Sequence, residues 1–250
     1  MPLEMKAIIL AAGQGKRLLP YTEGKPKCLV EIEGRPILEW QILVLSSQGV
    51  KEIVVMVGYQ AEKVRTFLEK FKDLSIRTIV NPDYETTDNL WTCWLATSEM
   101  NEDFILLNGD TLFEPRVLSK LLSSARPPAT ITINRKENYD EDDMKVIEEG
   151  GLLKHVGKKL DLARVNGESI GLLAFLKEGP QIFREILSEI VAENEAQRRW
   201  FLSAVDEMAQ RHPVWICDIT GLSWCEIDFP EDLEDGQRVV QKIKEDLSIK

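Results

Sequence analysis

A polar loop rich in glycine and cationic side chains begins about ten residues into the chain. It reads LAAGQGKRLLPYTEGKPKCLV and follows the apolar segment Lys6–Leu10, which predicts a buried strand. Two closely spaced glycines, Gly13 and Gly15, let backbone N–H groups close around a phosphate. Arg17 and Lys27 supply cations that can neutralise the phosphate from different sides. The loop predicts an anion site, and a flexible surface loop with solvated charges is the alternative.

Two common phosphate-binding motifs do not fit this loop. The third glycine of a dinucleotide-binding fingerprint would fall at Leu18. A Walker A loop requires Ser or Thr after Gly-Lys, but Gly15-Lys16 is followed by Arg17. The chemistry must therefore come from another arrangement of the same residue types.

Composition limits the classes of partner. The net charge of −11 argues against general nucleic-acid binding, because phosphate backbones are gathered by basic surfaces. Four cysteines without a Cys-x-x-Cys pattern and only two histidines argue against structural zinc and a disulfide framework. No apolar run approaches a membrane span, and no signal sequence is evident. We expect a cytoplasmic protein without nucleic-acid or membrane partners; a homo-oligomer is left open.

The order of apolar and amphipathic segments predicts an α/β fold. Strand-like runs cover Ile53–Val57, Ile76–Val80 and Phe104–Leu107, and helix-like stretches cover Ile37–Ser47, Ala61–Phe71 and Asn89–Met100. This alternation is typical of βαβ units and a largely parallel sheet, which binds ligands beyond the carboxyl ends of its strands.

The length and spacing of the apolar segments change near residue 129. Shorter segments at Ala129–Asn134, Met144–Glu148, Leu152–Val156 and Ser169–Phe175 predict antiparallel strands, and two later stretches, Pro180–Arg211 and Pro230–Leu247, predict helices. Arg135–Asp143, with its acidic run, is a candidate mobile loop. We predict one domain over residues 1–250, with two halves at 1–128 and 129–250.

The complete opening string resembles the signature of the nucleotidyltransferases that activate sugar phosphates and related small phosphates. Those proteins carry Leu-Ala-Ala-Gly-x-Gly-x-Arg-Leu, then Pro, Thr and Pro-Lys, then a short strand leading to Gly-(Lys/Arg)-Pro. Every element is present in this chain: Gly13, Gly15, Arg17, Leu18, Pro20, Thr22, Pro26, Lys27, Gly34 and Pro36. The resemblance implies a three-layer, Rossmann-like nucleotidyltransferase fold with a mainly parallel mixed sheet. It also implies a nucleotide-binding half at 1–128 and an acceptor-binding half with closing helices at 129–250.

Further segments match this family at similar distances along the chain. Asn108-Gly-Asp110 follows a predicted strand where the family places a metal-binding aspartate. Glu226-Ile-Asp228 resembles the second metal-binding segment, and the stretches around Lys158 and Glu168 are similar to the segment that holds the acceptor phosphate. The resemblance covers nearly the whole chain and is weakest over Arg135–Val156.

The resemblance implies a reaction and a role for each residue. A phosphate oxygen of the acceptor attacks the α-phosphorus of a nucleoside triphosphate and expels pyrophosphate. Catalysis then depends on positioning and charge stabilisation rather than on a general base. Arg17 would neutralise the leaving pyrophosphate and Lys27 the α-phosphate, while Asp110 and Asp228 would hold Mg²⁺. Lys158 would hold the acceptor phosphate. The nucleotide would be approached by the backbone of Leu10, Ala11, Ala12, Gly13 and Gly15.

Each of these residues also has a structural alternative when taken alone. Asp110 could be a cap or turn residue after its strand, and Asp228 could start the last helix. Lys158 and its neighbour Lys159 could form a solvated turn. Their joint occurrence with the opening loop favours the functional interpretation.

The stretch NPDYETTDNLWTCWLATSEM stands where the family contacts the base. Thr87-Asp88-Asn89 followed by aromatics looks more like the phosphocholine-type cytidylyltransferase subgroup, so Asn81, Asp88 and Asn89 are candidate nucleotide contacts. Trp91 is a candidate acceptor contact, in an aromatic cage for a quaternary ammonium with Trp94, Trp200 and Trp224. Helical spacing of the tryptophans also fits a place in the core.

The favoured function is Mg²⁺-dependent transfer of CMP from CTP to a small alcohol phosphate or phosphonate such as phosphocholine. A sugar-1-phosphate uridylyl-, thymidylyl- or guanylyltransferase is the first alternative. An inactive regulatory subunit would have lost a cation or carboxylate of the set above, and a glycosyltransferase of related fold would show an Asp-x-Asp motif, which Asn108-Gly-Asp110 is not.

Overall fold

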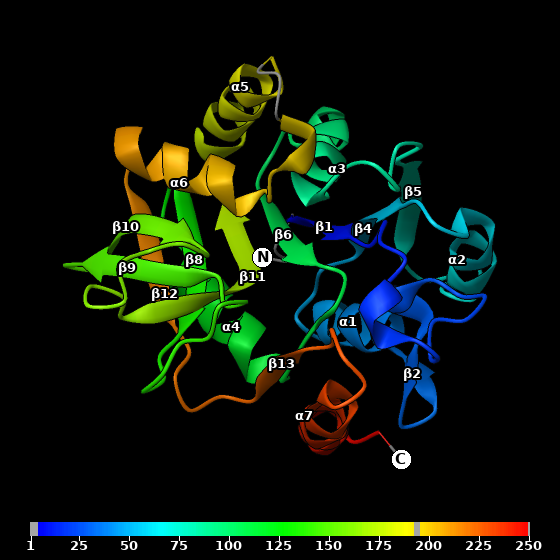
Figure 1. Cartoon of the computed structure of the whole chain (residues 1–250). Helices are drawn as coiled ribbons and strands as arrows, with labels where there is room; N and C mark the ends of the chain where they lie inside the picture. Colours follow the sequence, from blue (N-terminus) through cyan, green and yellow to red (C-terminus); the bar gives the residue numbers. More distant parts are fainter. Residues whose placement is uncertain (1–4, 193–195, 250) are drawn as a thin grey trace. The chain divides into compact units, whose positions relative to one another are not determined.

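A computed structural model describes residues 5–192 and 196–249 of the chain (Figure 1). These residues form two compact units, each assembled from segments that are separated in the sequence. The first unit takes in the chain up to Glu85, Leu107–Ser119 and the chain from Leu222 onward, and the second takes in Thr86–Leu106 and Lys120–Gly221. β6 (Phe104–Asn108) and α4 (Pro115–Ser124) carry the chain from one unit to the other.

Parallel strands form the sheet of the first unit. β1 (Lys6–Leu10) pairs in parallel with β4 (Glu52–Val57), and β4 pairs in parallel with β5 (Ser75–Val80). In the sheet order, β6 follows β1 on the side away from β4 (Figure 1). β1 is buried at every position, as expected for a strand covered on both faces. Figure 1 shows α2 (Ala61–Leu68) beside β5.

Smaller elements complete the first unit. Two short antiparallel pairs join β2 (Glu31–Ile32) with β3 (Arg35–Pro36) and β7 (Thr111–Phe113) with β13 (Trp224–Glu226). Helix α1 spans Ile37–Ser47, and α7 spans Asp232–Leu247 and packs against β7 and β13. Single 3-10 turns cover Lys16–Leu18 and Lys27–Leu29, both inside the opening loop.

The second unit has a mixed sheet. Its strands are β8 (Ala129–Asn134), β9 (Lys145–Glu149), β10 (Leu152–Gly157), β11 (Gly167–Phe175) and β12 (Val214–Asp218). Their order is β11-β8-β12-β10-β9; β8 and β12 are parallel, and the other neighbouring pairs are antiparallel. The helices of this unit are α3 (Asn89–Leu95), α5 (Gly179–Val191) and α6 (Leu202–Arg211).

Stacked phenylalanines mark the core of the second unit. The ring of Phe175 on β11 lies 4.7 Å from that of Phe104 and 4.4 Å from that of Phe183 on α5, centroid to centroid. All three side chains are fully buried, so the stack joins strand and helix through a large apolar area.

The predicted architecture agrees with this structure in its main features. Parallel strands in the first part of the chain and antiparallel strands after residue 129 are confirmed. Residues 193–195 of the predicted helical stretch Pro180–Arg211 lie outside the described residues. The short strands β7 and β13 and the strand β12 were not predicted. Among the described residues, no helix is long and apolar enough to cross a bilayer.

Candidate active site

The opening loop folds around the side chain of Lys27. Gly15 has φ = +74°, a left-handed conformation that favours glycine. A Cβ atom on Gly15 would lie 2.8 Å from the Cβ of Lys27, so only glycine leaves room for the lysine stem. The hydroxyl of Thr22 donates to the carbonyl of Gly15 at 2.9 Å and holds this turn. The glycine and the lysine of the motif are therefore parts of one packing unit.

Lys27 lies between two carboxylates that are far apart in the sequence. Its Nζ is 2.7 Å from Oδ2 of Asp110 and 2.5 Å from Oδ1 of Asp228. Arg17 contacts the other oxygen of Asp228, with Nη2 to Oδ2 at 2.9 Å. Two cations thus neutralise two anions at this centre.

The charge state of Lys27 follows from its surroundings. Burial disfavours the ammonium ion, but the two nearby carboxylates of Asp110 and Asp228 outweigh burial and raise the pKa of Lys27 above its usual value. Its side chain is only 12% exposed, so its charge is poorly screened by water. Lys27 therefore stays protonated at neutral pH and can act as a fixed positive charge.

Backbone pairing brings the two aspartates together. β7 and β13 pair with Thr111 opposite Glu226, and the N–H of Ile227 donates to the carbonyl of Asp110 at 3.1 Å. Asp110 precedes one strand and Asp228 follows the other, so an antiparallel pair places both at the same end. The sequence analysis did not predict this strand pairing.

Asp228 is held by a residue that the sequence analysis missed. Oδ2 of Asp232 accepts the N–H groups of Asp228 and Phe229 at 2.8 and 2.7 Å. The helix α7 begins at Asp232, and the side chain of Asp228, four residues earlier, contacts Lys27 and Arg17. The guanidinium of Arg17 also lies 4.8 Å from the ring centre of Phe229. An acidic residue at the start of a helix was the available signal for Asp232.

The carboxylate pair fits a magnesium ion. Oδ1 of Asp110 is buried and has no hydrogen-bond partner among the described residues, so it keeps an unused ligand position. Within the same part of the chain, no group of three or more His, Cys, Asp or Glu side chains could hold a metal. Magnesium is commonly bound by one or two carboxylates together with waters and substrate phosphates. Asp110 and Asp228 are thus suitable ligands for Mg²⁺ but not a closed cage.

The segment Leu10–Ala12 is fixed by its backbone. Ala11 donates to the carbonyl of Met56 at 3.0 Å, and the carbonyls of Leu10 and Ala12 accept from Gly109 and Tyr59 at 2.9 and 3.1 Å. Gly13, which follows, is exposed, and a Cβ there would meet no atom within 4 Å. The buried segment positions the loop, and the backbone at Gly13 is open to a ligand.

Two glycines outside the signature are as tightly placed as Gly15. A Cβ on Gly109 would lie 2.7 Å from the carbonyl oxygen of Leu10, and one on Gly58 would lie 2.6 Å from that of Ala12. Both glycines directly follow a strand, which was the sequence signal that could have identified them.

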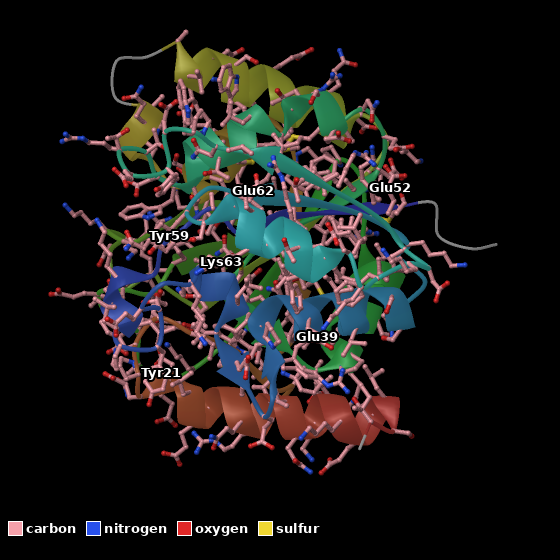
Figure 2. All side chains as sticks on the ribbon, turned by 90° about the vertical axis from the view of Figure 1, so that its right-hand side faces the viewer. Tyr21, Glu39, Glu52, Tyr59, Glu62 and Lys63 are labelled. Atoms are coloured by element: carbon pink, nitrogen blue, oxygen red, sulfur yellow. The ribbon has the colours of Figure 1, made fainter. Side chains whose placement is uncertain are left out.

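The loop also contacts helix α2. Lys63 on α2 donates its ammonium group to the carbonyl of Gly24. Figure 2 shows Lys63 on the same face as Tyr59 and as Tyr21, which belongs to the loop. This contact ties the exposed part of the loop to α2 within the first unit.

Asn81 has a structural role in the first unit. It is fully buried, its backbone N–H donates to Val57, and its side-chain oxygen accepts the N–H of Asp83 at 2.9 Å. This is a local turn held by the asparagine side chain. Its proposed contact with a nucleotide stays a prediction.

Asp88 and Asn89, in the second unit, join α3 to the segment before α6. Asp88 donates its backbone N–H to Gln197 at 2.7 Å, and Oδ1 of Asn89 accepts the N–H of Phe201 at 2.8 Å. Asn89 therefore connects two helices, whereas the exposed side chain of Asp88 remains accessible. Contact of either with a nucleotide stays a prediction.

The tryptophans of α3 lie between core and surface. The rings of Trp91 and Trp94 are 4.9 Å apart, and both residues are partly exposed, while their neighbours Leu90 and Cys93 are buried. Trp200 is 41% exposed, in the same unit. Trp224, on β13, belongs to the first unit.

Lys158 faces both an aromatic ring and a carboxylate. Its Nζ lies 4.8 Å from the ring centre of Trp200 and 3.1 Å from Oδ1 of Asp142. The ring face is thus already used by a cation, as cation–π attraction allows. Lys159 is exposed.

Glu168 is buried beside a lysine that the sequence analysis missed. Oε2 of Glu168 is 2.7 Å from Nζ of Lys136, which also lies 2.9 Å from Asp143, and its Oε1 accepts from Asn134 at 2.9 Å. Burial raises the pKa of Glu168, and the bonds from Lys136 and Asn134 oppose that rise. The acidic run Asp140–Asp143 thus neutralises two lysines, Lys136 and Lys158. No motif in the sequence singled out Lys136.

Comparison with known proteins identifies the class. The fold is similar to the solved structure of the inositol-1-phosphate CTP transferase from T. maritima, with a TM-score of 0.83 at 22% identity over 96% of both chains. That likeness, with the charge centre at Lys27, defines an α/β nucleotidyltransferase fold and confirms the predicted fold class. The family model described as MobA-like NTP transferase domain matches residues 7–216. The chain belongs to the family of MobA-like NTP transferases.

Two relatives are similar over most of this chain. CMP-5′-(3-aminopropyl)phosphonate synthase from Streptomyces rubellomurinus is 32% identical over 248 residues, covering 91% of this chain but 37% of that protein. CTP:phosphoglutamine cytidylyltransferase from Campylobacter jejuni is 28% identical over 251 residues, covering 92% of this chain and 98% of that protein. The chain therefore spans just over a third of one relative and nearly all of the other.

Proposed function

We propose that this protein transfers CMP from CTP to a small alcohol phosphate or phosphonate, with release of pyrophosphate. The observation that carries the proposal is the centre formed by Lys27, Asp110 and Asp228, with Arg17 beside it. An acceptor oxygen would form a bond to the α-phosphorus as the bond from that phosphorus to the β-phosphate bridging oxygen breaks. The acceptor phosphate is ionised near neutral pH, so a general base is not required.

The first unit would bind the nucleotide. The accessible backbone at Gly13 and the cations of Lys27 and Arg17 are suited to the charge of a triphosphate. Lys27 would stabilise charge on the α-phosphate and Arg17 would stabilise the leaving pyrophosphate. Asp110 and Asp228 would hold Mg²⁺, which supplies Lewis-acid stabilisation of the phosphates when it is bound.

The second unit would bind the acceptor. Lys158 and Lys136 each meet a carboxylate of the Asp140–Asp143 run, so an acceptor phosphate would take the place of an internal anion. The partly exposed rings of Trp91 and Trp200 and the carboxylate of Glu168 are candidates for contacts with the rest of the acceptor. This proposal differs from the predicted acceptor-binding half at 129–250, because it adds α3 and leaves out the chain from Leu222 onward, which belongs to the first unit.

The names of the two relatives favour CTP and a small acceptor. One is named for a CMP-linked aminoalkylphosphonate and the other for CTP and phosphoglutamine. Both acceptors join a phosphorus-containing acid to a small organic group, which agrees with a small alcohol phosphate or phosphonate here.

Pyrophosphate release tests the proposal. Purified protein would be assayed with Mg²⁺, each of CTP, UTP, GTP and dTTP in turn, and single acceptors: phosphocholine, phosphoethanolamine, 2-aminoethylphosphonate, 3-aminopropylphosphonate, inositol 1-phosphate, glucose 1-phosphate and mannose 1-phosphate. We expect release with CTP and one of the small phosphates or phosphonates, and none from Asp110→Asn. Release only with another nucleotide and a sugar 1-phosphate would refute the CTP assignment, and no release from folded protein would refute the transferase activity with these acceptors.

A further inference from the structure

A buried glutamine on helix α1 contacts the turn that carries Asp110. Gln41 is 1% exposed. Its Nε2 donates to the carbonyl of Asn108 at 2.8 Å and to the carbonyl of Thr111 at 2.8 Å. One amide group thus bonds the backbone on both sides of the sequence Gly109-Asp110.

Further contacts restrain the backbone of this turn on its other sides. Gly109 donates its N–H to Leu10 at 2.9 Å, and no larger residue fits there, since a Cβ would lie 2.7 Å from that same oxygen. The carbonyl of Asp110 accepts from Ile227. With the two bonds from Gln41, each of the four residues 108–111 has a backbone hydrogen bond. The partners come from three different parts of the chain.

The glutamine itself is imperfectly satisfied. Its Oε1 is buried and has no hydrogen-bond partner among the described residues. A buried polar atom without a partner is costly, and each such atom in a native structure calls for an explanation. The two hydrogen bonds that the side-chain amide donates to the Asp110 turn offset this cost.

We infer that Gln41 is a positioning residue that holds the carboxylate of Asp110 in the geometry needed to bind a divalent cation. The inference rests on the proposed function, because it assigns Asp110 to that cation. The side chain of Asp110 has one oxygen on Lys27 and the other buried and unpartnered, so a small rotation of the turn would misplace both. A few tenths of an ångström matter for Mg²⁺, which demands near-ideal octahedral geometry.

Two variants make a matched pair. Gln41→Met keeps the length and volume of the side chain but removes both donated hydrogen bonds. Gln48→Met makes the same change at the partly exposed residue that directly follows α1, where the side chain donates to its neighbour Ser47. Gln41→Leu removes the same two donors with a different apolar side chain, so it provides a second variant if Gln41→Met fails to fold.

The experiment measures Mn²⁺ binding by electron paramagnetic resonance with CTP present and acceptor absent, so that no turnover is needed. Hydrogen exchange of the segment 108–111 is measured in the metal-free protein. We expect Gln41→Met to weaken Mn²⁺ binding to the protein–CTP complex at least tenfold and to speed exchange of that segment. Gln48→Met should match the wild type in both, and Gln41→Leu should behave like Gln41→Met.

The outcomes separate this inference from the proposed function. Unchanged exchange at 108–111 in Gln41→Met would overturn the positioning role. If Gln41→Met keeps wild-type Mn²⁺ affinity while Asp110→Asn loses it, the inferred effect of Gln41 on metal binding is overturned. Its effect on the turn is not overturned by that result. A wild-type protein that binds neither Mn²⁺ nor CTP would overturn the proposed function and the metal role together, while faster exchange in Gln41→Met would still support positioning of the turn.

Discussion

Lys27 is the residue on which most of the site depends. In the protein without substrate its ammonium group is shared by Asp110 and Asp228, and its stem passes over Gly15. The same residue therefore organises the site and, in the proposed reaction, would supply positive charge to the nucleotide. Preorganised charge of this kind is usually the largest single contribution to catalysis.

Replacing Lys27 by alanine should lower turnover by about two orders of magnitude, because a preorganised charge at the α-phosphate is lost. Circular dichroism should show a folded protein. The measurement is the initial rate of pyrophosphate release at saturating CTP and acceptor. Lys25→Ala removes a charge two residues away in the same loop and should stay within a few-fold of wild type. Near-native turnover in folded Lys27→Ala would contradict its role.

Lys158 is expected to act on the acceptor instead. Lys158→Met should raise the KM for the acceptor about tenfold or more, since a charge-assisted bond to phosphate is lost, and should leave the KM for CTP unchanged. Lys159→Met, at the exposed neighbouring position, is the matched control. Equal effects of the two variants on the acceptor KM would show that the position of Lys158 beside Trp200 and Asp142 has no special role.

The elements of the first unit place the site by meeting at strand ends. β1 leads into the opening loop, β6 leads into the Asp110 turn, and β13 leads to Asp228. Glycines that directly follow β4 and β6 allow the connecting segments to approach one another closely. The geometry of the site therefore depends on small residues at the strand ends as much as on the charged ones.

Gly15→Ala tests this close approach. Both Gly15→Ala and Gly24→Ala place a Cβ at positive φ in the same loop, so each should lose about 1 kcal/mol of stability. Only the Cβ at Gly15 would collide with Lys27; that at Gly24 would meet no atom within 4 Å. We expect kcat/KM for CTP to fall at least tenfold in Gly15→Ala only. A similar fall in Gly24→Ala would point to loop strain rather than to displacement of Lys27.

At the scale of the whole molecule, the acidic surplus is organised into local networks. In the second unit, Arg135 on the segment after β8 bonds Asp218 at 2.7 Å and Glu148 at 2.9 Å. Partial burial works against the charge on Asp218, but hydrogen bonds from Thr220 and Arg135 outweigh it and lower the pKa of Asp218. Ionised carboxylates with such partners stabilise the fold only while they are ionised.

This network predicts a pH dependence of stability. Because the folded-state pKa of Asp218 lies below its unfolded value of about 3.9, its contribution is present above that pH and is lost as pH falls through the folded value. Asp218→Asn should therefore lower Tm at pH 7 by at most about 2–4 °C, since the pair is partly solvent-exposed. The difference from wild type should shrink between pH 4 and pH 2.

Thermal unfolding followed by circular dichroism at pH 7, 4, 3 and 2 measures this effect. Asp73→Asn, at an exposed position of the first unit, is the control and should match the wild type throughout. A Tm difference for Asp218→Asn that stays constant down to pH 2 would contradict an ionisation-linked contribution.

The sequence by itself determined the local features of this protein. The periods of apolar residues gave the bounds of β1, α1 and β8 without error, because burial on one face or on both imposes those periods directly. The long opening motif likewise identified the loop and its cations. Asn81 and Asn89 were predicted as nucleotide contacts, and this stays a prediction; the bond of Asn89 to Phe201 depends on which segment lies beside it.

Only the tertiary structure decided how the charges are combined. Asp110 and Asp228 meet because two three-residue strands pair across more than a hundred residues of sequence, and strands this short carry almost no periodic signal. The contacts made by Gln41 and Lys136 could not be predicted for the same reason: a polar side chain shows its type in the sequence but not its partner. Hydrogen bonds and ion pairs act over a few ångströms, so they are set by long-range packing rather than by local pattern.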